Sequence, residues 1–347
     1  MTMHFYSPKF RKQGRKPLKL KALGEFKLID RIREQASEGE GVDRGIGDDA
    51  AVLNLPEGHQ LLTSTDLLIE GVHFRHDWTD CESLGHKAVA VNLSDIAAMG
   101  GSPRYLYLGL ACPDEAEISD IDAFLRGVFD ETAKYGVSLV GGDTCRSPGP
   151  WMISVTVEGS APRHQAVCRD GAQPGDLIMV SGTLGDSALA LRLIEEDKEA
   201  HTHLLKRHHQ PVAQVELGRL LGENHLASAM IDVSDGLAGD LEHILQASQV
   251  DGLIEEAELP LSEEFQVHLD KAPDLLELAL YGGEDYELLF TVSPDQAPAV
   301  RELCAARQLP VTTIGSISKG SGLLSLKEKT GEVRPLLVRG YDHFCRT

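Results

Sequence analysis

The sequence predicts a mixed α/β (α+β) fold with two domains, each a mixed sheet covered by helices. The chain has 347 residues, which is more than one compact core usually accommodates. Apolar residues alternate with period two in some stretches and recur at helical spacing in others. The two patterns interleave along the whole chain, as is typical of strands covered by helices.

The N-terminal segment differs from the rest of the chain. Residues 1–23 carry many Lys and Arg and no acid, and they lack the apolar region of a secretion signal. We expect a disordered basic tail there; a transit peptide and a misassigned start codon are the alternatives. Turn formers in 159–163 and 171–176 then predict a first domain over 24–162 and a second over 163–347.

The first domain is predicted to open with a helix near 24–32, because Phe26, Ile29 and Ile32 are spaced by about one turn. The elements that follow are a strand over 61–65 ending at Asp66, a helix over 83–99 stopped by Gly100 and Gly101, an alternating strand over 105–110, a helix over 121–135, a strand at 139–140 that runs into the turn Gly141-Gly142-Asp143, and an alternating strand over 153–157.

The second domain repeats the interleaving. It is predicted to contain a buried strand over 177–180, a helix after the turn 181–187, a strand over 229–231 leading into Asp232-Val233-Ser234-Asp235-Gly236, a helix marked by Leu237, Leu241, Ile244 and Leu245, and a strand over 286–292. We find no close tandem repeat.

Composition excludes several classes of function. A formal net charge of −21 would repel a phosphate backbone over most of the surface, so we expect no nucleic-acid partner. No apolar run reaches the roughly 18 residues that could span a bilayer, so a soluble cytoplasmic protein without a membrane partner is predicted. The 6 cysteines form no C-x-x-C pair and are expected to be reduced thiols.

Acidic residues gather in short turns beside Gly, Ser or Thr. Taken singly, each is explained by capping or by a solvated turn, as Ser234 and Asp235 illustrate before the following helix. As a set from both halves they indicate a metal site. Two carboxylates about 4 Å apart repel by roughly 4 kcal/mol at an effective dielectric of about 20, and hard oxygen ligands suit Mg²⁺. The candidate ligands are Asp48, Asp49, Asp66, Asp95, Asp143, Asp232 and Asp235.

The common nucleotide-binding signatures are absent. The chain has no G-x-x-x-x-G-K-[ST] loop, no full G-x-G-x-x-G and no H-R-D loop, and Gly45-Ile46-Gly47 fits a plain turn equally well. Lys87 and Arg169 are the most plausible phosphate partners, with a surface role as the alternative. His73 is either a packed histidine or part of a polar site near Asp66.

A set of motifs from about Gly24 to Phe344 resembles one known family. The motifs are GEFKLI, GIGDDAA, STDLLIEGVHF, KAVAVNLSDIAAMG, GGDT, QPGD, SGTLGDSA, IDVSDGL, GGEDYEL and GYDHF. The chain resembles the thiamine-monophosphate kinase family, within the superfamily that includes aminoimidazole ribotide synthetase and selenophosphate synthetase. The resemblance implies ATP-dependent phosphorylation of thiamine monophosphate to thiamine diphosphate, in thiamine diphosphate biosynthesis. It also implies a homodimer whose N-terminal sheets close a barrel.

The resemblance further implies roles for individual residues. Several Mg²⁺ ions would be held by Asp49, Ser64, Thr65, Asp66, Asp95, Asp143, Asp232 and Asp235. ATP would be contacted by Tyr135, Gly142, Asp143, Arg169 and Ser234, and thiamine monophosphate by His73, Glu284 and Tyr341. Because the acceptor phosphate is already a nucleophile, we expect metal-assisted in-line transfer without a general base or a covalent intermediate.

Other interpretations stay open at this point. The chain could be a non-catalytic Mg-nucleotide sensor of the same fold, an aminoimidazole ribotide synthetase or a metal-dependent phosphatase. Selenophosphate synthetase is disfavoured, because its reactive cysteine lies in an N-terminal glycine-rich loop and the first cysteine here is Cys81. The segment 206–214 departs from the family's pattern, with Gln210 and Gln214 where relatives often carry Arg.

Overall fold

The structure is a computed structural model that describes residues 18–36 and 38–336 of the chain. Its first half contains α1 (Leu20–Leu23), α2 (Glu25–Gln35), β1 (Val42–Arg44), β2 (Val52–Leu53), β3 (His59–Ile69), α3 (Cys81–Ala98), β4 (Ser102–Cys112), α4 (Ile118–Tyr135), β5 (Ser138–Arg146) and β6 (Met152–Pro162). The elements confirm the predicted mixed α/β class.

The second half begins after a connection with no regular element. It contains β7 (Leu177–Ser181), α5 (Asp186–Glu195), α6 (Thr202–His209), α7 (Val215–Glu223), β8 (Ala229–Asp232), α8 (Leu237–Ser248), β9 (Val250–Glu255), η1 (Glu256–Glu258), α9 (Glu263–Leu269), η2 (Pro273–Leu275), α10 (Leu276–Tyr281), β10 (Leu288–Val292), α11 (Ala297–Ala305), β11 (Val311–Lys319), β12 (Leu324–Lys327) and β13 (Val333–Pro335).

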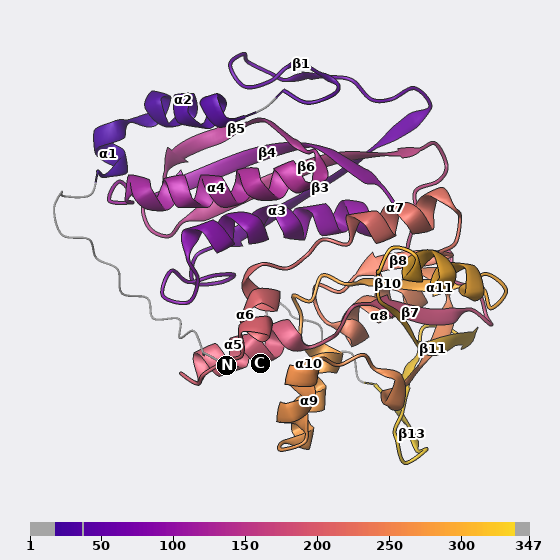
Figure 1. Ribbon diagram of the computed structural model, residues 1–347. Coiled ribbons are helices and arrows are strands. Elements are labelled where there is room, and N and C mark those ends of the chain that lie inside the picture. Colours follow the sequence, from indigo (N-terminus) through magenta and orange to yellow (C-terminus); the bar gives the residue numbers. More distant parts are fainter. Residues whose placement is uncertain (1–17, 37, 337–347) are drawn as a thin grey trace.

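The first half is built on a four-stranded sheet in the order β3-β6-β4-β5, with α3 and α4 against one face (Figure 1). β6 runs antiparallel to both β3 and β4, whereas β4 and β5 are parallel. Alternation decides which side chains enter the core: Leu62 and Leu68 of β3 are buried, while Leu61 and Leu67 are exposed on the other face. One face of the sheet is therefore covered by helices and the other carries exposed apolar side chains.

Helix α3 forms the centre of the molecule, between α4 and the second half (Figure 1). It begins at Asp80, whose Oδ1 accepts a hydrogen bond from the Ser83 N–H at 2.8 Å and caps the first turn. A Cβ at Gly85 would lie 2.1 Å from the carbonyl oxygen of Phe124, so α4 approaches α3 more closely than any larger residue allows. Most of α3 is buried, which holds its polar side chains in fixed positions.

The second half is built on a seven-stranded sheet in the order β13-β12-β9-β11-β7-β10-β8, with helices on both faces. Ile178 and Val180 of β7 face the cluster formed with α5, α8 and α10. Met179, between them, faces the cluster formed with α7 and α11. Strand β7 thus alternates between two apolar cores and is buried on both sides, which explains its unbroken apolar sequence.

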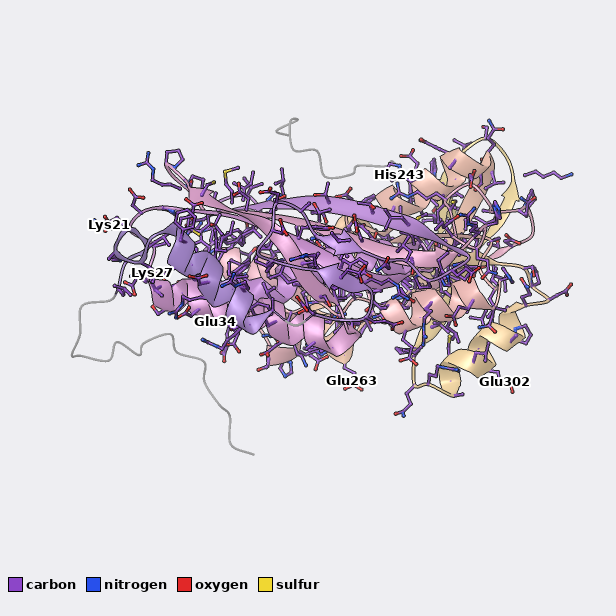
Figure 2. All side chains as sticks on the ribbon, turned by 90° about the horizontal axis from the view of Figure 1, so that it is seen from above. Lys21, Lys27, Glu34, His243, Glu263 and Glu302 are labelled. Atoms are coloured by element: carbon purple, nitrogen blue, oxygen red, sulfur yellow. The ribbon has the colours of Figure 1, made fainter. Side chains whose placement is uncertain are left out.

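The two halves meet where α3 packs on α7. Ala97 and Ala98 of α3 lie in one apolar cluster with Leu217 of α7 and Phe290 of β10. A Cβ at Gly218 would lie 2.1 Å from the Ala97 carbonyl oxygen, so this helix contact is backbone to backbone. Figure 2 shows charged side chains pointing outward at both ends of the molecule, among them Lys27 in the first half and Glu302 in the second.

Two predicted turns are strand interiors. Asp66 lies within β3, which continues to Ile69 and pairs with β6 along its whole length. The predicted turn Gly141-Gly142-Asp143 lies within β5, which pairs with β4 as far as Arg146. Pairing with a neighbouring strand outweighs the turn preference of Gly and Asp at both places. At Gly142, where φ is 148°, a Cβ would lie 1.9 Å from the Leu108 carbonyl oxygen, so glycine is required by packing.

One buried face and two boundaries also differ from the prediction. Phe26 is 80% exposed, and Leu28 and Ile32 form the buried stripe of α2 instead. Strand β10 begins at Leu288, because Tyr286 has a positive φ of 52° that no strand accommodates. Residues 18–23, predicted as part of the tail, contain α1, whose Leu20 N–H donates to the Ala116 carbonyl oxygen. Within the described ranges, no helix is long and apolar enough to cross a membrane.

Candidate functional site

Carboxylates from both halves meet along α3. Ser64 of β3 donates a hydrogen bond from Oγ to Oδ2 of Asp95 on α3 at 2.5 Å. One residue earlier on α3, Ser94 donates from Oγ to Oδ2 of Asp232 at the end of β8, at 2.7 Å. Two adjacent residues of α3, Ser94 and Asp95, therefore join carboxylates from the first and the second half. We call Asp66, Asp95 and Asp232 the central cluster.

The pKa values of the three carboxyl groups in the central cluster are raised. Burial, followed by the charge of Asp95, raises the pKa of Asp66 to about 6. The pKa of Asp232 is raised by burial and then by Asp95 and Asp66, and burial also raises the pKa of Asp95. The charge of Arg169 lowers the pKa of Asp95, so this exposed guanidinium lies close enough to act on the cluster. Three acids that mutually disfavour ionisation form a site that a cation would stabilise.

Asp240, which the sequence analysis missed, holds the turn after β8. Its Oδ2 accepts hydrogen bonds from the backbone N–H groups of Ser234, Asp235 and Gly236 at 3.0, 3.0 and 3.1 Å. Burial, and then the charge of Asp232, raise the pKa of Asp240 to about 8. A carboxylate in the first turn of the helix after the motif was the available signal. Asp240 fixes the backbone that carries Asp232 and Asp235.

The donor atoms of the central cluster are of the type that suits a hard divalent cation, although among the described residues only Glu82, His86 and Asp130 bring three ligand atoms within 4.8 Å of one another. Asp66, Asp95 and Asp232 offer carboxylate oxygens, and no softer nitrogen or sulfur ligand is tied to them by the contacts of the described residues. Oxygen-only sets of this kind suit Mg²⁺. The raised pKa values point the same way, because an added cation would favour the ionised form of each acid.

We expect the metal-free protein to lose stability as the pH rises. Folded-state pKa values of about 8 for Asp240 and about 7 for Asp285 lie above the ordinary value of an aspartate. Groups raised in this way contribute stability at low pH and lose it as the pH passes through the folded pKa. The lowered pKa values of His208 and His209 act in the opposite direction, but only below the ordinary histidine pKa.

The measurement is the Tm in EDTA at about pH 7.5 and about pH 9, both above the ordinary histidine pKa, with an expected fall of about 5 °C. Millimolar Mg²⁺ should reverse much of the fall at the higher pH, because a ligand that binds only the folded state stabilises it. A Tm that stays constant or rises between these pH values would contradict the electrostatic description of these buried acids.

Glu284 lies where the two halves face each other. Its Oε1 is 3.1 Å from Nζ of Lys87 on α3, and its Oε2 is 3.3 Å from Nδ1 of His208 on α6. Its backbone has a positive φ of 67°, and its N–H donates to the carbonyl oxygen of Ser234 at 2.8 Å. Lys87, predicted as a phosphate partner, is therefore paired with a carboxylate in this structure.

A buried ionic cluster is formed by Arg207 with Asp285 and Glu287, which follow Glu284 in the chain. Arg207 donates from Nη2 to Oε1 of Glu287 at 2.8 Å and to the carbonyl oxygens of Asp285 and Thr183 at 3.2 Å each. Burial raises the pKa of Asp285 to about 7 and also raises the pKa of Glu287, while Arg207 opposes both shifts. Arg207 thus holds the backbone between two positive-φ residues, Glu284 and Tyr286. No local spacing links α6 to the GGEDYEL motif, so this role of Arg207 is not predictable from the sequence.

The two glutamines that depart from the family's pattern both make contacts between distant segments. Gln210 donates from Nε2 to Oγ of Ser83 on α3 at 2.9 Å. Gln214 donates from Nε2 to Oε2 of Glu287 at 2.8 Å. Neutral amides therefore link the segment after α6 to the first half and to the buried ionic cluster.

Other predicted ligands lie away from the central cluster. The strand register places Thr65 and Asp143 on the exposed face of the first sheet. Ser64 and Asp66 lie on the opposite face. The hydroxyl of Thr65 lies 3.1 Å from the Val155 carbonyl oxygen. Asp49 is exposed in the turn after β1 and donates its N–H to Asp48, and Asp235 is exposed in the turn after β8.

The remaining predicted contact residues are placed as follows. Tyr135, at the end of α4, donates from its hydroxyl to the Ala213 carbonyl oxygen at 3.2 Å, and Gly142 is exposed on β5. His73 follows β3, and its Nδ1 accepts the Ile69 N–H at 3.1 Å, which places the ring proton of the neutral imidazole on Nε2. Tyr341 lies outside the described residues.

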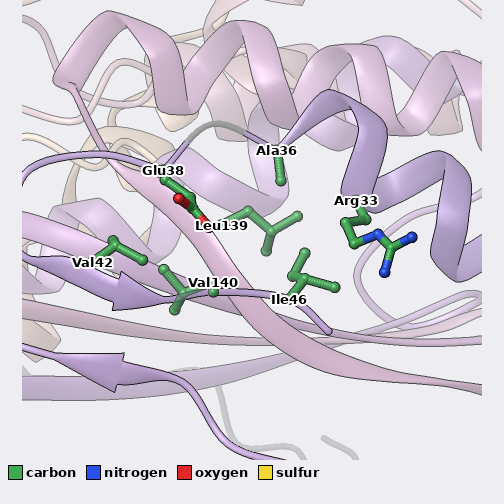
Figure 3. Close-up of a pocket in the computed structure, with 8 residues that line it drawn as sticks. Arg33, Ala36, Glu38, Val42, Ile46, Leu139 and Val140 are labelled. Atoms are coloured by element: carbon green, nitrogen blue, oxygen red, sulfur yellow. The ribbon is translucent and has the colours of Figure 1, made fainter. Parts of the chain in front are cut away.

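A small pocket of about 50 Å³ lies between α2, β1 with the segment that follows it, and β5. Figure 3 shows the apolar side chains of Val42, Ile46, Leu139 and Val140 lining it, with Arg33 at its margin. The lining includes Gly45 and Ile46, which are separated from Asp48 and Asp49 by one residue. The pocket thus adjoins the acidic turn but contains no member of the central cluster.

Two family models match the chain. Residues 47–161 match the N-terminal domain of AIR synthase related proteins, and residues 173–324 match the C-terminal domain. The chain is 41% identical to a thiamine-monophosphate kinase from Escherichia coli (strain K12) over 334 residues, which cover 93% of this chain and 99% of the relative.

Solved structures agree with these matches. The fold is similar to a crystal structure of thiamine-monophosphate kinase from Stenotrophomonas maltophilia, with a TM-score of 0.79 and 42% identity over 88% of this chain and 96% of that one. It is also similar to a structure described as AaThiL complexed with AMPPCP and TMP. There the TM-score is 0.73 and the identity 35%, over 94% of this chain and 99% of that one.

Proposed function

The chain belongs to the thiamine-monophosphate kinase family, and from this premise we propose that it transfers the γ-phosphate of ATP to thiamine monophosphate, forming thiamine diphosphate and ADP. The observation that carries the proposal is the central cluster of Asp66, Asp95 and Asp232, whose members come from both halves. Acids that disfavour their own ionisation are suited to bind cations between two polyanionic substrates.

We propose that the central cluster, with Ser64, holds Mg²⁺ as the first part of a larger site. When bound, Mg²⁺ would neutralise phosphate charge and align the transferred group. The chain's own contribution is rigidity: Ser64 and Ser94 orient Asp95 and Asp232, and Asp240 fixes the turn of Asp232 and Asp235. Asp49, Thr65, Asp143 and Asp235 stay predicted ligands.

The two substrates are proposed to contact different sets of residues. Arg169, whose charge reaches Asp95, and Ser234, whose turn lies beside the cluster, are suited to the ATP phosphates, and Tyr135 and Gly142 complete the proposed nucleotide contacts. His73, Glu284 and Tyr341 are the proposed contacts of thiamine monophosphate. The acceptor phosphate needs no strong base at neutral pH, which leaves the carboxylates free to position metal.

We also propose a homodimer formed through the exposed face of the first sheet. Leu61 and Leu67 of β3 and Met152 of β6 share this face and are exposed, although each is apolar. Sheets that meet through such faces bury apolar surface and could close a barrel. Light scattering should give twice the chain mass of 37.7 kDa, whereas a mass equal to one chain would refute the dimer.

The domain division and the location are proposals as well. A boundary near residue 162 is supported by the gap between the two matched family models and by the separate sheets on either side. A cytoplasmic location is supported by free thiols at Cys81, Cys112 and Cys304, each of them buried.

The experiment that tests the function is ATP turnover with Mg²⁺, with and without thiamine monophosphate, with all products separated by chromatography. One thiamine diphosphate formed for each ADP supports the proposal. ATP bound without turnover would favour the nucleotide sensor, and ADP with inorganic phosphate would favour a phosphatase.

A further inference from the structure

A lysine on α3 is buried at the contact between the two halves. Lys87 is 4% exposed, and its Nζ lies 3.1 Å from Oε1 of Glu284. A buried ammonium group is costly unless a carboxylate compensates it, and the net stabilisation from such a pair is small or negative. A gain in folding stability therefore does not explain the pair of Lys87 and Glu284. Its geometry indicates a role in substrate binding.

Glu284 is fixed by two side-chain contacts and one backbone hydrogen bond, and part of its side chain is exposed to solvent. Lys87 and His208 contact its two carboxylate oxygens, and the Ser234 carbonyl oxygen accepts its backbone N–H. The side chain nevertheless keeps 27% of its surface exposed. A carboxylate fixed in this way can present one edge to a ligand without losing rotamer freedom on binding.

The same helix also sets the position of the central cluster. Ser94 lies seven positions after Lys87, or about two helical turns, so both side chains leave the same face of α3. Lys87 reaches Glu284, while Ser94 reaches Asp232. The Ser234 contact of Glu284 joins these two points within the second half. Helix α3 thus fixes the distance between Glu284 and the carboxylates.

We propose that Lys87 is a positioning residue for thiamine monophosphate, which acts by holding the Glu284 carboxylate at a set distance from the central cluster. This inference rests on the proposed function and deepens it. Thiamine carries a cationic thiazolium ring and an amino group, either of which a fixed carboxylate can bind. Lys87 itself is turned toward Glu284 and acts on the substrate only through that residue.

Two other roles for Lys87 make different predictions. If Lys87 only stabilised the fold, its removal would lower Tm and leave the KM of the remaining folded enzyme unchanged. If Lys87 bound a phosphate directly, its removal would add to the effect of removing Glu284. A double-mutant comparison separates these roles from positioning, because a residue that acts through Glu284 has no effect once Glu284 is changed.

The experiment measures KM for thiamine monophosphate and for ATP separately in the full chain with Mg²⁺. Lys87→Met should raise KM for thiamine monophosphate about tenfold or more and leave KM for ATP within about twofold, because a charge that orients only Glu284 is lost. Lys87→Arg should recover part of the effect. Lys206→Met removes an exposed positive charge from nearby α6 and serves as the matched control, with both KM values unchanged.

The double variant Lys87→Met/Glu284→Gln should match Glu284→Gln alone. An additive effect, or equal changes in both KM values, would overturn the inference. If Lys87→Met fails to fold, Lys87→Gln keeps a hydrogen-bond donor of similar length without the charge and is read in the same way. A wild-type enzyme that makes no thiamine diphosphate refutes the proposed function. Unchanged kinetics of a folded Lys87 variant in an active enzyme refute only the positioning role.

Discussion

Asp66→Asn should lower kcat by about 100-fold or more while leaving the fold intact. Asp66 lies within β3, beside Asp95, and burial and that neighbouring charge raise its pKa to about 6. The amide keeps the volume and removes one metal-binding charge, so catalysis should suffer and packing should not. In EDTA the Tm should stay equal or rise, because repulsion within the central cluster falls.

The matched control is Asp77→Asn, which removes an exposed carboxylate paired with Arg75. It should leave kcat within about twofold of wild type, since exposed ion pairs contribute little. Near-normal turnover of Asp66→Asn, or a large loss of Tm without metal, would contradict the assignment of Asp66 to metal binding.

Arg207→Met should lower the free energy of unfolding by about 3–5 kcal/mol, the cost of leaving buried carboxylates without their cation. Arg207 is 14% exposed and donates to Glu287, which is 2% exposed, and to the Asp285 backbone. Gln214 is the neutral partner of Glu287 and cannot replace the lost charge. Urea unfolding, read through its midpoint and slope, measures the effect.

Arg192→Met is the control for Arg207, because Arg192 forms an exposed pair with Glu196 four residues away on the surface of α5. Its loss should cost less than about 1 kcal/mol. A similar small loss for Arg207→Met would show that Asp285 and Glu287 are protonated in the folded protein and need no cation.

The sequence predicts the elements of this fold well where apolar residues form an unbroken run or recur at helical spacing. Strand β7 and helices α3 and α8 lie where their apolar patterns place them. Turn preferences fail at Asp66 and at Gly141-Gly142-Asp143, since partner strands far away in sequence extend β3 and β5 through them. Pairing over such distances leaves no local signal.

The sequence proposes candidate residues for the site but says little about their geometry. The motifs bring Asp66, Asp95 and Asp232 into one candidate set. In the structure Ser64 binds Asp95 and Ser94 binds Asp232, and burial, then the charges of Asp95 and Asp66, raise the pKa of Asp232. The contacts that hold the site in place were not predicted, although Lys87 and Glu284 were each candidate residues. Lys87 and Glu284 are 197 positions apart by their numbers, and Arg207 and Glu287 are 80 apart. Their contacts follow from packing of the two halves, which no spacing along the chain encodes.

The most direct test of the account is a single-turnover reaction of the full chain with ATP labelled on its γ-phosphate, with Mg²⁺ and thiamine monophosphate. Direct in-line transfer predicts that the label passes from ATP to thiamine diphosphate and is never attached to the protein. Label on the protein during turnover, or label released only as inorganic phosphate, would contradict a metal-assisted transfer between two phosphates.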